Sequence, residues 1–82
     1  MDETERRILA LLRDLEAVPS ADPEITSSAG FIHLRRDGVV LATDIPTGAA
    51  LDDLLAHGWI AETSHGHFRI TSAGLRAIGA RQ

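Results

Sequence analysis

The histidines between residues 57 and 67 are the first candidates for chemistry. His65 and His67 lie two residues apart beside Gly66, and at a turn both imidazoles could reach one metal ion, with His57 as a third ligand. The sequence offers no convincing fourth ligand. Surface histidines that suit a turn are therefore the favoured interpretation, and we expect no metal site.

Serine and carboxylate side chains could in principle supply a nucleophile or an acid–base pair. The combinations present are Ser64 with His65, Ser72, and the adjacent pair Asp52 and Asp53. None of them lies in a recognisable nucleophile turn or phosphate loop. Neighbouring carboxylates on a helix also diverge by about 100° around its axis, so the pair is poorly placed to act together. The sequence thus predicts that the chain is not an enzyme and needs no cofactor.

Arginines could bind phosphate. All the cationic residues are arginines, and the net charge is -4, so a nucleic-acid site would require them to gather on one face. Arg35 and Arg36 form the best local basic pair, although solvated arginines that protect a hairpin edge are an equal alternative. We expect Arg69 to pair with Glu62 across a hairpin.

Composition sets limits on the class of protein. The 82 residues suit one domain with a thin core, and the absence of cysteine excludes disulfides and thiolate metal sites. No apolar run approaches the roughly 18 residues of a membrane span, and the start "MDETERR" is acidic, unlike a signal peptide. We expect a soluble, cytoplasmic chain.

The first half of the chain must position these side chains. Apolar residues at helical spacing predict a helix over 2–18, with acidic residues at its start and i,i+4 pairs such as Glu3 with Arg7. Residues 19–30 are expected to form a loop that holds at most one helical turn, capped by Asp22 with Pro23 at its first position.

Residues 31–43 can be interpreted in two ways. As a hairpin with a two-residue turn at Asp37-Gly38, they place Leu34 opposite Leu41 and Ile32 opposite Thr43. As a helix, the segment would end at Asp37 with Gly38 as its left-handed cap. The β-rich residues on both sides of the turn favour the hairpin.

The second half predicts a helix, a hairpin and a helix. The first helix spans 47–57, with Thr47 as N-cap, Gly58 as terminator and Leu51, Leu54 and Leu55 on its buried face. A turn at His65-Gly66 follows, and one face of the hairpin points inward, namely Trp59, Ala61, Thr63, Phe68 and Ile70. Thr71 or Ser72 caps the last helix, which returns Leu75 and Ile78 to the core.

The segment "LDDLLAHGWIAETSHGHFRITSAGLRAI" resembles the C-terminal half of bacterial winged-helix repressor domains. The shared run is a helix ending Leu-x-x-x-Gly-aliphatic-Ile, a short wing hairpin, and Leu/Ile-Thr-x-x-Gly opening another helix. Its positions here are Leu54, Gly58, Trp59, Ile60, Ile70, Thr71 and Gly74. The resemblance covers about a third of the chain.

The resemblance implies a reading helix and a wing that touch DNA. It places Thr47, Gly48 and Ala49 at the helix start, with Asp52 and Asp53 close by, and Ser64 to His67 on the wing. Two features depart from the family. The expected hairpin takes the place of the helix before the reading helix, and the two aspartates would face phosphate.

The sequence thus predicts an α+β, winged-helix-like domain over 1–82, with three or more helices, a wing hairpin and an additional hairpin at 31–43. The first functional hypothesis is a regulator that binds double-stranded DNA, and we expect it to dimerise through its first and last helices. Its contacts would be Arg35, Arg36, Thr47, Gly48, Ala49, Ser64, His65, His67 and Arg69. The alternative is a protein-interaction module, such as an adaptor or a phage-encoded inhibitor.

Overall fold

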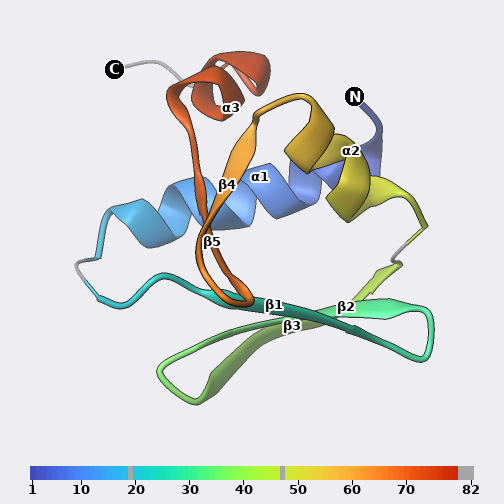
Figure 1. The fold of residues 1–82 in the computed structure, drawn as a ribbon, viewed down its shortest axis with the longest axis vertical. Coiled ribbons are helices and arrows are strands. Elements are labelled where there is room, and N and C mark those ends of the chain that lie inside the picture. Colours follow the sequence, from blue (N-terminus) through green and yellow to red (C-terminus); the bar gives the residue numbers. More distant parts are fainter. Residues whose placement is uncertain (19, 47, 80–82) are drawn as a thin grey trace.

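The computed structural model describes residues 1–18, 20–46 and 48–79 and has three helices and five strands within them (Figure 1). In chain order these are α1 (Glu3–Glu16), β1 (Glu24–Ser28), β2 (Phe31–Arg36), β3 (Val39–Pro46), α2 (Ala50–Ala56), β4 (Ile60–Ser64), β5 (His67–Ile70) and α3 (Ser72–Ala77). The chain is therefore a small α+β domain. The predicted N-cap Thr47 lies outside the described residues.

Helix α1 confirms the first predicted helix. Asp2 and Glu5 form a capping box, in which Glu5 N donates to Asp2 Oδ1 (2.8 Å) and Asp2 N donates to Glu5 Oε1 (2.9 Å). The helix buries Ile8, Leu9 and Leu12. The pairing expected between Glu3 and Arg7 is replaced by a longer-range one, because Arg7 Nη2 lies 2.7 Å from Asp44 Oδ1.

The five strands form one antiparallel sheet in the order β3-β2-β1-β5-β4. Helix α1 runs along one side of the β1–β3 layer, and all three helices lie on that side (Figure 1). The opposite side of this layer, away from the helices, carries exposed residues. The described chain therefore has one core, between the helices and one face of the sheet.

Strand β1 contradicts the loop expected over 19–30. Ile25 lies opposite Leu34 and is buried, so pairing with β2 stabilises a segment whose Ser and Thr content argued against it. The turn into β2 is Ala29-Gly30, with positive φ at both residues (54° and 84°). Alanine rarely takes that conformation, so this turn carried no sequence signal.

The β2–β3 hairpin confirms the hairpin interpretation of residues 31–43. The turn is Asp37-Gly38, with φ of 54° and 78°, and Arg36 lies opposite Val39. The predicted register is wrong beyond that point, since two irregularities place Leu34 opposite Ala42 and Ile32 opposite Ile45. They turn Ile45 into the core.

Helix α2 is shorter than the predicted helix. It begins at Ala50, and its N-cap Ala49 makes no side-chain hydrogen bond. Gly58 ends it with a φ of 72°, as expected, and Trp59 N donates to Leu54 O (3.0 Å). Leu54 is buried, whereas Leu55 is exposed, contrary to prediction.

The β4–β5 hairpin has the predicted turn and a different register. The two-residue turn at His65-Gly66 is confirmed, and of its residues Gly66 has the positive φ (78°). Ser64 still lies opposite His67, but a bulge at residue 63 then places Glu62 opposite Phe68. The inward face is therefore Ile60, Phe68 and Ile70, while Ala61 and Thr63 are exposed.

Helix α3 starts where the sequence predicted. The Oγ1 of Thr71 accepts from Gly74 N (3.1 Å) and donates to Gly58 O (2.6 Å). A side chain at Gly74 would place its Cβ 2.2 Å from the Trp59 carbonyl oxygen, so the glycine permits this close approach. Leu75 and Ile78 pack against the core, as expected. No helix in the described ranges is long and apolar enough to cross a membrane.

Candidate functional site

The tip of the β4–β5 hairpin is joined to β1. Ile25 N donates to Gly66 O and Phe68 N donates to Pro23 O, both at 2.9 Å, and Glu24 lies opposite His67. The Nδ1 of His67 lies 2.9 Å from His65 O, so Nδ1 carries the proton and donates to that carbonyl. The predicted wing is thus one end of a continuous sheet, with β5 inside and β4 at the edge, and His67 is half-buried.

Arg35 and Arg36 do not act as a pair, because successive side chains on β2 point to opposite faces. Arg36 reaches toward α1, where its Nη1 donates to the carbonyl oxygens of Leu15 (2.9 Å) and Val18 (3.2 Å). It thereby satisfies carbonyls at the end of the helix. Arg35 is exposed and lies opposite Glu24 on β1.

The expected pair of Arg69 with Glu62 is wrong. Arg69 Nη2 lies 3.2 Å from both carboxylate oxygens of Glu16, at the end of α1. The Glu62 carboxylate instead accepts from Gly66 N (2.9 Å). The bulge in β4 is the cause, since it sets Ala61 opposite Arg69 and moves Glu62 one position toward the turn.

The residues predicted to touch DNA fall into separate groups. Arg35, Arg36, His67 and Arg69 surround residues 20–24, whereas Ser64 and His65 are exposed near the hairpin turn. Gly48 and Ala49 are exposed at the start of α2, where the first helical turn carries Asp52 and Asp53. The helix start therefore carries the two carboxylates that the sequence placed there, and these disfavour contact with phosphate.

Residues 20–23 connect three parts of the molecule. The Ser20 hydroxyl donates to the Asp37 carboxylate at the β2–β3 turn, and Thr63 Oγ1 donates to Asp22 Oδ2 (2.7 Å) from β4. Pro23 is buried and its carbonyl binds β5. Sequence reasoning missed this role, because each contact is made to a residue distant along the chain.

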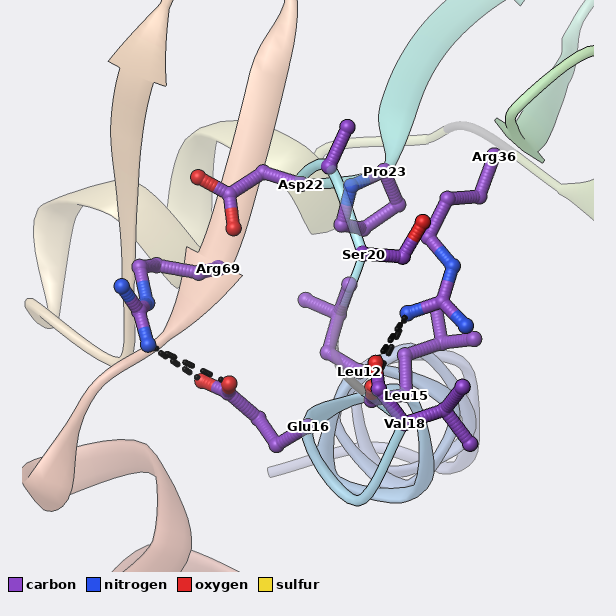
Figure 2. Close-up of a pocket in the computed structure, with 10 residues that line it drawn as sticks. Leu12, Leu15, Glu16, Val18, Ser20, Asp22, Pro23, Arg36 and Arg69 are labelled. Atoms are coloured by element: carbon purple, nitrogen blue, oxygen red, sulfur yellow. Dashed lines mark hydrogen bonds and ion pairs between the residues drawn. The ribbon is translucent and has the colours of Figure 1, made fainter.

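A hollow of about 250 Å³ lies between the end of α1 and residues 20–23 (Figure 2). Apolar side chains make up part of its wall, namely Leu12, Leu15, Val18, Ala21 and Pro23. Arg69 and its partner Glu16 lie on one side of the hollow, and Arg36 lies on the opposite side. We call this cavity the α1-end hollow.

A second hollow, of about 320 Å³, adjoins the first along residues 21 and 22. It is lined chiefly by charged side chains, namely Asp22, Glu24, Arg35, Arg36, Asp37 and His67. Its carboxylates oppose its guanidinium groups, so it presents no uniform positive surface.

Exposed apolar side chains accompany the α1-end hollow. Val18 follows α1 and is 56% exposed, and Val39 and Val40, next to the β2–β3 turn, are 59% and 54% exposed. Arg36 connects the two groups, since it binds Val18 O and lies opposite Val39. Val40 lies opposite Arg35 and so shares the face of the sheet that points away from α1. The α1-end hollow together with Val18 and Val39 is named the α1-end surface.

The described residues include no group of three or more His, Cys, Asp or Glu that could hold a metal ion. The expectation that the chain is not an enzyme stays a prediction. Comparisons with models of protein families, with curated proteins and with solved structures gave no match. The function of the α1-end surface is therefore inferred from its shape, exposure and charge.

Proposed function

We propose that the chain is a small protein-interaction module that binds its partner through the α1-end surface. The observation that carries the proposal is a hollow with a partly apolar wall beside exposed Val18, with exposed Val39 opposite Arg36, which lines the same hollow. Contiguous exposed apolar side chains with a polar rim are typical of protein interfaces. Their exposure costs free energy that a protein partner would recover by burial.

The charges near this surface favour a protein partner over a nucleic acid. Affinity for a phosphate backbone needs cations that are free to replace counterions. Here Arg69 is paired with Glu16, and Arg36 is bound to the end of α1. Asp22 and Asp37 line the same hollows, so a polyanion would meet carboxylates beside each guanidinium group.

The winged-helix interpretation is part of the proposal only for the C-terminal half. The order α2, β4, β5, α3 supports it, and so does the cap at Thr71. Three strands occupy the part of the chain where a helix would precede the reading helix. With Asp52 and Asp53 in the first turn of α2, duplex DNA has less support here than a protein partner does.

Selection from a peptide-display library on the immobilised protein tests the proposal. We expect enriched peptides that bind the wild type and lose affinity in the double variant Val18→Ser, Val39→Ser. Leu55→Ser is the matched control, since Leu55 is also exposed and apolar but lies on α2. No enriched peptides, or peptides whose affinity falls only with Leu55→Ser, would overturn the proposal.

A further inference from the structure

The α1-end hollow has the features of a site for one side chain of a partner. Its volume, about 250 Å³, lies below the roughly 300–1,000 Å³ of pockets that bury drug-sized ligands. Protein interfaces concentrate their binding energy in a few large side chains that fill such pockets. We infer that this hollow receives one aromatic side chain of the partner, between the guanidinium groups of Arg36 and Arg69; the inference rests on the proposed function.

The apolar lining supplies the first part of the recognition. Leu12 is buried, Leu15 and Val18 come from the same end of α1, and Pro23 closes the hollow from the other side. An inserted side chain would remove from water the part of this wall that is still exposed, at Leu15 and Val18. This contribution alone would accept aliphatic and aromatic side chains alike.

The two guanidinium groups supply the preference for an aromatic ring. Arg69 and Arg36 lie on opposite sides of the hollow (Figure 2). Each is held through one terminal nitrogen, Arg69 Nη2 by Glu16 and Arg36 Nη1 by the carbonyls of Leu15 and Val18. Their planar groups are thereby positioned before binding, and guanidinium planes are attracted to the faces of aromatic rings.

Charge excludes the other large side chains. A lysine or arginine from the partner would meet both guanidinium groups, and the two carboxylates of the lining are already engaged, Glu16 by Arg69 and Asp22 by Thr63. A carboxylate would compete with Glu16 for Arg69 and would lose its hydration over the apolar lining. An aromatic ring satisfies both parts of the hollow at once.

A titration followed by ¹⁵N–¹H spectra of the whole chain tests this inference. The probe is N-acetyl-tryptophanamide, and N-acetyl-leucinamide is the aliphatic control. We expect the tryptophan probe to shift the amides of Leu15, Val18 and Ala21 and to bind more tightly than the leucine probe. Arg36→Lys and Arg69→Lys keep the charge and remove the planar group, and each should weaken the tryptophan probe about two- to five-fold.

Arg13→Lys is the matched control, because Arg13 lies on α1 and pairs with Asp14 away from the hollow. Equal affinity for both probes, shifts confined to other residues, or full affinity in both lysine variants would overturn the inference. Enriched display peptides without an aromatic residue would also overturn it while the proposed function stands. Failure of the display selection would remove the proposed function itself.

Discussion

At the scale of single residues, the adjacent arginines of β2 show how a strand separates two like side chains. Arg36 completes α1 by binding the carbonyls of Leu15 and Val18, and Arg35 faces away from that helix. The sequence gives both residues the same type and adjacent positions. Only the pairing of the strand decides that one of them is structural.

This difference predicts unequal effects of alanine substitution. Arg36→Ala should lower the free energy of unfolding by about 1–2 kcal/mol, because the carbonyls of Leu15 and Val18 each lose a charged donor. Arg35→Ala should change it by less than about 0.5 kcal/mol, since Arg35 is exposed. Urea denaturation followed by circular dichroism measures both values. Equal effects of the two substitutions would contradict the assignment of Arg36 to the end of α1.

At the scale of elements, turns and caps could be predicted from the sequence better than registers could. Asp37-Gly38, Gly58 and Thr71 act through their own backbone conformations or short-range hydrogen bonds, and each was found as expected. The inward face of β4 was wrong, because a bulge moves one residue out of the pairing and exchanges the faces beyond it. No local signal marks such a bulge.

The prediction of a loop over residues 19–30, where β1 lies, was wrong for a different physical reason. Three polar residues of β1, Thr26, Ser27 and Ser28, are exposed, and Ile25 is its buried residue. Its stability comes from pairing with two strands. Strand β2 follows it directly, and β5 is distant along the chain. The same pairing creates the wall of the α1-end hollow at Pro23, so the candidate site could not be predicted before the strand was known.

The junction of β1 with β5 predicts slow amide exchange at two positions. Ile25 N and Phe68 N donate across it, to Gly66 O and Pro23 O. Both amides should exchange more slowly by at least ten-fold than the amide of Ala61 on the exposed edge strand β4, because opening requires the two hairpins to separate. Hydrogen–deuterium exchange resolved by residue measures this. Fast exchange at both positions would indicate a hairpin that is free of β1, as a projecting wing would be.

At the scale of the whole molecule, charge is dispersed. Arg7, Arg13 and Arg69 each pair with a carboxylate of this chain, and the start of α2 carries Asp52 and Asp53. A net charge of -4 then adds a general repulsion of polyanions. Arg35, Arg36 and Arg69 line the two hollows together with Glu16, Asp22, Glu24 and Asp37, whereas duplex binding requires cations gathered on one face.

We therefore expect no shift of duplex DNA in a mobility assay at 150 mM salt with tens of micromolar protein. This concentration is a suitable test, because nonspecific DNA binders commonly have dissociation constants of about 10⁻⁴–10⁻⁶ M at such salt. The measurement should be repeated with Arg35→Ala, which spares the end of α1, in preference to a double variant with Arg36. A shift that weakens steeply with salt and is lost in Arg35→Ala would restore the DNA-binding hypothesis. Binding that persists in this variant at high salt would locate the contact away from β2, because the exposed guanidinium of Arg35 is the one in that strand not bound to α1.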